Sequence, residues 1–270
     1  MTLPDDGLTR RTLLQLASGA AALTALPGLA HSRRVSERDD LAAIFRNEGL
    51  DGCFAHYSPS TDNLTLVNGP RARTRFVPAS TFKIANSLIA LETGVVKDEN
   101  EIIPYGGKPQ PIKAWEKDMG LVEAIKISNV PVYQEIARRV GVENYEHWLK
   151  TLDYGNRQCG DVVDRFWLDG PLQISAVEQA EFVARLAQGK LPASERSQAI
   201  VRRILEVERR DGRVLFAKTG WAMKKGWWAG WVEHEGSVDA FALNFEMQNI
   251  EGAPKRISIG KELLGKLGVY

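Results

Sequence analysis

The stretch RVLFAKTGWAMKKGWWAGWVEHEGSVDAFALNFEM, residues 213–247, is typical of three consecutive β-strands. Its apolar residues follow the period of strands over RVLFAKTG, GWWAGWVEHEG and VDAFALNFEM, so alternate side chains belong to opposite faces of a sheet. Gly236 supplies the turn between the second and third strands. The stretch therefore predicts neighbouring antiparallel strands near the end of the chain.

A further hairpin is predicted near the beginning of the chain. CFAHYSP (53–59) and LTLVN (64–68) read as two short strands around a polar turn at residues 60–63. We expect this hairpin to open the mature chain and a helix at KRISIGKELLGKLG (255–268) to close it. Strands at both ends predict a mainly antiparallel sheet that the two termini share.

Helices are predicted between these two groups of strands. Three segments carry the helical signals: VYQEIARRVG (132–141), ENYEHWLKTL (143–152) and SAVEQAEFVARLAQG (175–189). Ser175 and Glu178, at the start of the third, have the spacing of a capping box. The fold class is therefore α/β of the α+β type, with a helical lobe at about residues 95–190 beside the sheet. A cleft between lobe and sheet is the natural place for a ligand.

The composition indicates an ordinary globular protein with a small-molecule partner. The 270 residues are 44% hydrophobic and 26% charged, which allows one large domain or two small ones and supplies ample material for a core. Lys and Arg total 35 against 34 Asp and Glu, so the net charge of +1 gives no attraction to nucleic acid or to an anionic membrane. A small neutral or singly charged ligand is expected, and a homodimer is left open.

Histidines and cysteines give no sign of a metal site. His31, His56, His147 and His234 are scattered without the spacing of metal ligands, so no bound metal is expected. Cys53 and Cys159 stand 106 positions apart. They are either two buried thiols, which we favour because cysteine packs as a small hydrophobe, or a disulfide.

The N-terminal segment TRRTLLQLASGAAALTALPGLA, residues 9–30, has the features of an export signal. Paired arginines precede a short apolar stretch, and small residues precede a cleavage site that we place after Ala30. The pair Arg10-Arg11 further resembles a twin-arginine signal. We therefore expect residues 1–30 to be removed and residues 31–270 to form a single catalytic domain in the bacterial periplasm, without stable insertion in the membrane.

A serine and a lysine occur together in the apolar stretch FVPASTFKIANSLIALETG, residues 76–94. The stretch predicts a helix that is apolar on most sides and therefore interior. Ser80 and Lys83, three positions apart, lie on one face and can meet, as a nucleophile and its base would. The alternative is a serine that caps the helix and a lysine that extends to solvent.

Two further motifs favour the catalytic interpretation. FAKTGW places Lys218, Thr219 and Gly220 at the end of a strand, and ISNVP places Ser128 in a loop before a helix. S-x-x-K, a serine-containing triplet and K-T-G together characterise serine β-lactamases and penicillin-binding proteins. Each triplet is common alone, but three in this order on helix, loop and strand are specific.

The mature chain resembles the class D serine β-lactamases over nearly its whole length. The matching motifs are STFK with Phe82, SNV with Val130, YGN at 154–156, FWLDGPLQIS with Trp167 and Leu168, and KTGW followed by GWWAGWVE. The resemblance implies the β-lactamase/transpeptidase-like fold and hydrolysis of a β-lactam through an acyl-serine. VPVYQEIARR, FWLDG and SERSQAIV look like the carbapenem-hydrolysing branch, whereas the link WAMKKG is shorter than that branch leads us to expect.

Hydrolysis through an acyl-serine needs a base twice, once for the serine and once for water. No histidine stands in any of the motifs, so Lys83 is the candidate. Among Phe82, Val130, Trp167 and Leu168 its amine would be desolvated and its pKa lowered. The resemblance implies that CO2 or bicarbonate then carboxylates Lys83 to N6-carboxylysine, held by the Trp167 indole, with no organic cofactor or metal.

The resemblance also implies roles for other residues. Ser128 would pass the proton to the leaving nitrogen with support from Lys218, and the backbone amides of Ser80 and Trp221 would hold the oxyanion. The substrate-binding residues would be Thr219, Gly220, Trp221, Arg256, Val130, Leu168 and Trp115. Ordinary structural roles remain open for some of these: core packing for Trp167, a solvated helix face for Arg256, a surface position for Trp115, and a turn for residues 154–156.

The leading functional hypothesis is a periplasmic β-lactam hydrolase that confers β-lactam resistance. We expect penicillins as substrates, and oxacillins, cephalosporins and carbapenems are left open. One alternative is a β-lactam sensor domain, which is acylated without releasing the product. The other is a penicillin-binding transpeptidase, against which the small size, Val130 and Trp167 count.

Overall fold

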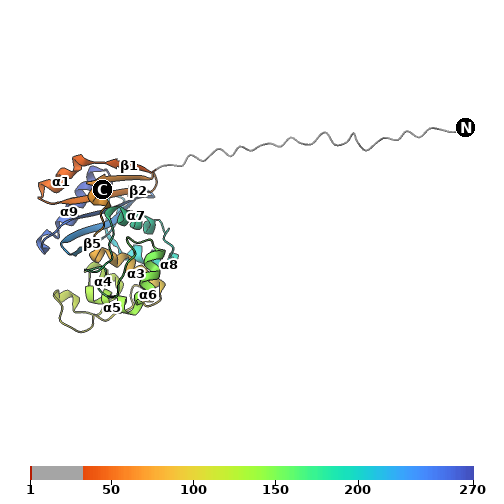
Figure 1. Cartoon of the computed structure of the whole chain (residues 1–270), viewed down its shortest axis with the longest axis vertical. Helices are drawn as coiled ribbons and strands as arrows, with labels where there is room; N and C mark the ends of the chain where they lie inside the picture. The colour runs from red at the N-terminus through yellow and green to blue at the C-terminus, as the bar shows by residue number, and fades with distance from the viewer. Residues whose placement is uncertain (2–32) are drawn as a thin grey trace. The chain divides into compact units, whose positions relative to one another are not determined.

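A seven-stranded sheet is the centre of the computed structural model, which describes Met1 and residues 33–270 (Figure 1). Its strand order is β1-β3-β2-β7-β6-β5-β4. The strands are β1 (Arg34–Glu37), β2 (Gly52–Ser58), β3 (Asn63–Val67), β4 (Glu206–Arg210), β5 (Arg213–Ala222), β6 (Lys225–His234) and β7 (Ser237–Glu246). The expected export signal lies outside the described residues.

The three strands predicted at the end of the chain are confirmed as β5, β6 and β7. They pair antiparallel, with Lys218 opposite Ala229 and Trp228 opposite Leu243. Two-residue turns with positive φ connect them, at Met223 and Lys224 (φ 47° and 58°) and at residues 235–236 (φ 49° and 77°). Such turns match the twist of the strands that they join.

The predicted sharing of the sheet by both termini is confirmed, because β2 pairs antiparallel with both β3 and β7. The expectation that the hairpin β2–β3 opens the mature chain is wrong. Strand β1 and helix α1 (Ala42–Asn47) precede the hairpin, and β1 pairs parallel with β3. Strands β1 and β4 are the two edges of the sheet, and neither was predicted. Both are short and mostly polar or exposed, so their sequences lack the apolar alternation that marks a buried strand.

Helices cover both faces of the sheet. Helices α1 and α9 (Lys255–Lys266) pack on one face through a cluster that contains Phe45, Trp228 and Leu263. Helix α7 (Ala176–Ala187) packs on the other face, where Ala180 and its small neighbours in β2, β6 and β7 let the helix approach closely. Figure 1 shows α7 between the sheet and the helical lobe. The capping box predicted at Ser175 is present.

Helix α3 (Lys83–Glu92) stands before the bounds of about 95–190 predicted for the helical lobe, but it packs in the same core as the helices of the lobe and is buried from Lys83 to Leu91. The predicted helices at 132–141 and 143–152 are confirmed as α5 and α6. The helices in addition to α1, α3, α7 and α9 are α2 (Gly69–Arg73), α4 (Leu121–Lys126), α5 (Val130–Val140), α6 (Val142–Thr151) and α8 (Glu195–Ile204). Short 3₁₀ turns are η1 (Asp39–Leu41), η2 (Ala79–Phe82), η3 (Lys113–Trp115) and η4 (Ile250–Gly252).

Both cysteines are buried free thiols, so the favoured interpretation of Cys53 and Cys159 is confirmed. In the part of the chain that the structure describes, no helix combines the length and the apolar character needed to cross a membrane.

Candidate active site

Ser80 and Lys83 are in direct contact at the junction of η2 and α3. The Nζ of Lys83 donates a hydrogen bond of 2.8 Å to the Oγ of Ser80. Lys83 is fully buried, and Ser80 is 8% exposed. The contact predicted from the i, i+3 spacing is therefore present, and the alternative in which Lys83 extends to solvent is excluded.

Burial is the main cause of a strongly lowered pKa at Lys83. The nearby positive charge of Lys218 lowers the pKa in the same direction. The Nζ also lies 5.2 Å from the ring centre of Tyr133 on α5. Tyr133 is a neighbour that the sequence reasoning missed, although it stands one helical turn after Val130 on the same face. A neutral amine next to a hydroxyl is able to act as a base.

Trp167 lies in the core of the helical lobe. Its indole is fully buried, and its ring centre is 5.6 Å from that of Phe82, the residue before Lys83. The Nε1 of Trp167 has no hydrogen-bond partner among the residues that the structure describes. Because an unsatisfied buried N–H is costly and rare, this donor is suited to an added acceptor group.

The K-T-G segment of β5 lies directly against η2. A Cβ on Gly220 would be 3.1 Å from the backbone nitrogen of Ser80, so glycine is what permits this approach. Lys218 is 5% exposed and donates a hydrogen bond of 3.0 Å to the backbone oxygen of Thr219. Burial, and next the charge of Arg256, lower the pKa of Lys218 to about 7.

Arg256 joins the site from α9. Its Nη1 donates a hydrogen bond of 2.8 Å to the backbone oxygen of Gly220, and its Nε donates one of 3.0 Å to Ala253. The guanidinium therefore does not lie on a solvated helix face. Trp221, in contrast to Arg256, is 38% exposed, and its indole donates a hydrogen bond to the backbone oxygen of Met247. The predicted oxyanion role concerns the backbone amide of Trp221 and not this side chain.

Ser128 stands in the loop between α4 and α5 with a φ of +58°, which is unusual for a residue with a side chain. Asn129, fully buried, holds this loop: its Oδ1 accepts from the Val132 amide at 3.0 Å. Its Nδ2 donates to the backbone oxygen of Trp115 at 3.2 Å. Asn129 is not among the residues predicted from the sequence, although an asparagine just before a helix with proline in its first turn is a capping signal.

The remaining predicted residues lie beside the Ser128 loop or on the core of the helical lobe. Trp115, in η3, donates from its indole to the backbone oxygen of Ile127, next to Ser128. Val130 begins α5, and Leu168 packs against the core that holds Phe82. Both are partly buried.

Lys218 and Thr219 line a cavity of about 390 Å³ that reaches Ile125 and Lys126 of α4. Ser80, Lys83 and Ser128 do not line this cavity. The start of α3 and α9 meet β5 instead through Gly220, which lies against the Ser80 amide and accepts the hydrogen bond from Arg256.

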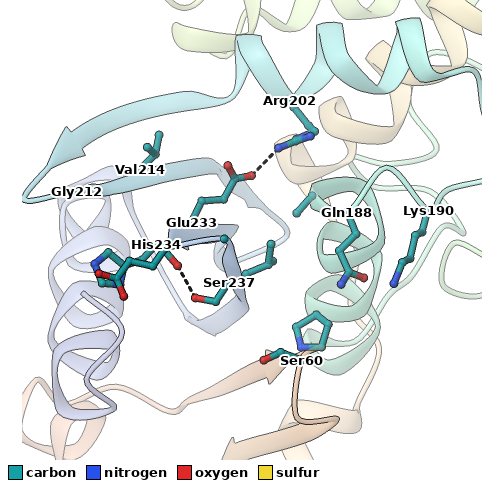
Figure 2. Close-up of a pocket in the computed structure, with 14 residues that line it drawn as sticks. Ser60, Gln188, Lys190, Arg202, Gly212, Val214, Glu233, His234 and Ser237 are labelled. Carbon is teal, nitrogen blue, oxygen red and sulfur yellow. Dashed lines mark hydrogen bonds and ion pairs between the residues drawn. The ribbon is translucent and has the colours of Figure 1, made fainter.

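A larger cavity of about 590 Å³ lies elsewhere, at the start of β5 and the turn between β6 and β7 (Figure 2). There, an Nη of Arg202 lies 2.8 Å from the Oε1 of Glu233, and the Oγ of Ser237 donates to the backbone oxygen of His234. None of the predicted catalytic or substrate-binding residues lines this cavity. Size alone therefore does not locate the candidate site.

A serine and a lysine at the start of a buried helix, facing a K-T-G strand, define the serine acyl-transfer site of β-lactamases and penicillin-binding proteins. The chain matches the family of penicillin-binding protein transpeptidase domains over residues 52–265. It is 39% identical to β-lactamase OXA-5 of Pseudomonas aeruginosa over 245 residues, 88% of this chain and 92% of that protein. It is 40% identical to β-lactamase OXA-48 of Klebsiella pneumoniae over 248 residues, 90% and 93% of the two chains.

A solved structure agrees with these relatives. The crystal structure of FUS-1 (OXA-85), a class D β-lactamase from Fusobacterium nucleatum subsp. polymorphum, superposes with a TM-score of 0.84 at 39% identity. The match covers 87% of this chain and 99% of that chain. The chain therefore belongs to the penicillin-binding protein transpeptidase family and, within it, to the class D β-lactamases. The resemblance inferred from the motifs is confirmed.

Proposed function

We propose that the protein hydrolyses the β-lactam ring of penicillins through an acyl-enzyme on Ser80 and thereby confers resistance to them. The observation that carries the proposal is the 2.8 Å contact between the Oγ of Ser80 and the buried, low-pKa amine of Lys83. The relatives are named β-lactamases, which supports the same chemistry here. Export to the periplasm is proposed from residues 9–30 alone.

Acylation of Ser80 requires removal of its proton as its oxygen attacks the lactam carbonyl. The base at position 83 takes the proton, and the backbone amides of Ser80 and Trp221 stabilise the oxyanion. When the carbon–nitrogen bond breaks, Ser128 donates its proton to the ring nitrogen. Lys218, with a pKa of about 7, is suited to resupply Ser128 because it exchanges a proton readily near neutral pH.

Deacylation requires a base that activates water, and carboxylation of Lys83 would supply one. The lowered pKa of Lys83 supports this modification, since only an uncharged amine can attack CO2 and form a carbamate with loss of a proton. The unsatisfied Nε1 of Trp167 supports it further, because it would donate to a carbamate oxygen. N6-carboxylysine would provide a negatively charged oxygen base for both half-reactions.

Recognition of the substrate carboxylate is assigned to Thr219 and Arg256. Arg256 uses Nη1 and Nε on backbone oxygens, and a guanidinium has five N–H donors, so others remain for a ligand. Gly220 keeps β5 close to η2, while Val130, Leu168 and Trp115 would border the bound substrate. The turn between β5 and β6, at Met223 and Lys224, is short, which favours penicillins over carbapenems as substrates.

A chromogenic cephalosporin tests the proposed function directly. We expect repeated turnover by the purified protein, faster with added bicarbonate, and no turnover by Ser80→Ala. A penicillin should be hydrolysed under the same conditions. One turnover followed by a stable acyl adduct would instead identify a sensor or a transpeptidase, and the hydrolase proposal would be withdrawn.

A further inference from the structure

The turn that carries Ser80 has an unusual backbone at the residue before the nucleophile. Ala79 is fully buried and has a φ of +52°, in the left-handed region that residues with a Cβ rarely occupy. Such a conformation persists only where its surroundings hold it in place. Any relaxation at Ala79 would move both the backbone amide and the hydroxyl of Ser80. The contacts that hold this turn therefore bear on the reaction.

A chain of three buried hydrogen bonds closes the turn. The hydroxyl of Thr81 donates at 2.7 Å to the backbone oxygen of Pro78, across Ala79 and Ser80. The Nε2 of Gln179 donates at 2.5 Å to the Thr81 hydroxyl. The hydroxyl of Tyr154 lies 3.4 Å from the Oε1 of Gln179, to which it donates. Every donor points the same way, toward the turn, so each bond polarises the next.

Rigid elements hold the outer end of this chain. Gln179 stands in α7, which packs on the sheet through small residues such as Ala180. Tyr154 is fixed between the rings of Phe82 and Phe182 at centre distances of 5.5 and 5.0 Å. Gly155 follows with a φ of +54°, and a Cβ there would come within 2.1 Å of a backbone oxygen. The Tyr154-Gly155-Asn156 motif thus does more than form a turn, because it directs Tyr154 to Gln179.

We propose that Gln179 is a positioning residue for the nucleophile, acting through Thr81 to hold the strained turn at Ala79. In this arrangement the Ser80 hydroxyl faces Lys83, and the Ser80 amide faces the β5 backbone at Gly220. The proposal rests on the proposed function, because it assigns Gln179 to the acyl-transfer reaction of Ser80. It predicts that substitution of Gln179 lowers the rate constants of the reaction at Ser80 and leaves the binding of the substrate carboxylate unchanged.

The substitution Gln179→Leu removes both hydrogen bonds and keeps a similar volume. Active sites are first titrated with a slowly released β-lactam, so that each rate refers to correctly folded enzyme. We expect kcat and kcat/KM per active site to fall together by about 30-fold with KM nearly unchanged, since small displacements of a reacting group are costly. A rate per active site equal to that of the wild type would overturn the proposal.

The matched control is Gln198→Leu. Gln198 is a 2% exposed glutamine in α8 whose amide makes three hydrogen bonds, all to the backbone at residues 191 and 193. It contacts no part of the nucleophile turn through these bonds. We expect Gln198→Leu to lower stability while its rate per active site stays within about twofold of the wild type. An equal loss of rate in both glutamine variants would contradict a specific role for Gln179.

A double-mutant cycle with Thr81→Val tests the path from Gln179 to the turn. If Gln179 acts through Thr81, the double variant is no slower than the slower single variant. If the two residues act independently, the losses of rate of the two single variants multiply. Tyr154→Phe keeps the hydrogen bond from Gln179 to Thr81, so we expect it to lower the rate per active site only about threefold. This variant takes the place of Gln179→Leu in the test if Gln179→Leu does not fold. Multiplicative losses would overturn the proposal. If the wild type itself fails to turn over β-lactams, the proposed function fails first.

Discussion

The Nζ of Lys83 lies 2.8 Å from the Oγ of Ser80, although both residues are buried. A lysine in that position is costly as a cation and therefore has a strongly lowered pKa. The same burial that opposes the charged form therefore favours the uncharged amine. That amine can accept the Ser80 proton or react with CO2, so the environment of Lys83 is part of the chemistry.

Replacing Lys83 by alanine should leave a folded protein that fails to release its product. We expect kcat to fall by about 10² to 10⁴-fold, because removal of a general base affects both half-reactions. Mass spectrometry after addition of a penicillin should reveal a lasting acyl adduct on Ser80. Lys97→Ala, at an exposed lysine, is the control and should keep wild-type turnover. Full activity of Lys83→Ala would contradict the assigned base.

The lowered pKa of Lys218 predicts a stability that increases with pH. Its pKa is about 7 in the folded protein against an ordinary 10.5, so between these values the unfolded chain binds a proton that the folded protein has released. The free energy of unfolding should therefore rise from pH 7 to about pH 9.5, by on the order of 3 kcal/mol from this group. Urea unfolding of the wild type and Lys218→Met should reveal a smaller rise in the variant. Lys266→Met, at an exposed lysine, should keep the wild-type rise.

Much of the sheet was predictable because its central strands alternate regularly between two buried faces. Strand β6 illustrates this, since it pairs on both sides and its tryptophans pack on helices. The edge strands β1 and β4 were not predictable from the same signal. Each has one neighbour and mostly polar or exposed residues, so no buried period marks it.

The contact between Ser80 and Lys83 was predictable because it depends on one helical turn. Gln179 and Thr81 stand 98 positions apart, and no local pattern places one beside the other. The partner of a buried glutamine is decided by how α7 packs on the sheet, which is a tertiary property. Tyr133 and Asn129 are intermediate cases, because each stands within a few residues of a recognised motif.

Trp167→Phe tests the proposed partner of the carboxylated lysine. We expect the variant to need about tenfold more bicarbonate for half-maximal activity, because the carbamate would lose an indole donor. Carbon-13 NMR with labelled bicarbonate should give a weaker carbamate signal at equal concentrations. Trp231→Phe is the matched control, since that buried indole donates instead to Glu233, which lines the cavity of Figure 2. Equal bicarbonate dependence in the wild type and Trp167→Phe would contradict the assignment.

Arg256 should affect both substrate binding and the titration of Lys218. Arg256→Ala should raise KM for a penicillin by about 10- to 100-fold through loss of a charged hydrogen-bond donor. Loss of its positive charge should also raise the pKa of Lys218 and shift the corresponding limb of the kcat/KM profile to higher pH. Arg256→Lys keeps the charge without the fork, so we expect a raised KM and an unshifted profile. If the pH profile of Arg256→Ala matches that of the wild type, the observed limb does not report the titration of Lys218.

Asn129→Ala should impair Ser128 through the loop that carries it. Asn129 caps α5 and also binds the backbone at Trp115, so its loss should cost about 1 to 2 kcal/mol of unfolding free energy. Ser128 has a positive φ, and without these bonds its backbone should relax toward an ordinary conformation. We therefore expect kcat/KM per active site to fall by about tenfold, mainly in acylation, where the leaving nitrogen needs its proton.

Ser194→Ala provides the comparison for this loss of a helix cap. Ser194 caps α8 in the same way, by accepting from the Ser197 amide at 3.2 Å, but none of its described contacts involves the candidate active site. Its substitution should lower the unfolding free energy by about 1 kcal/mol and leave the rate per active site unchanged. Stopped-flow acylation and urea unfolding of both variants separate the two effects. If Asn129→Ala loses stability but acylates at the wild-type rate, the loop geometry at Ser128 does not limit the reaction.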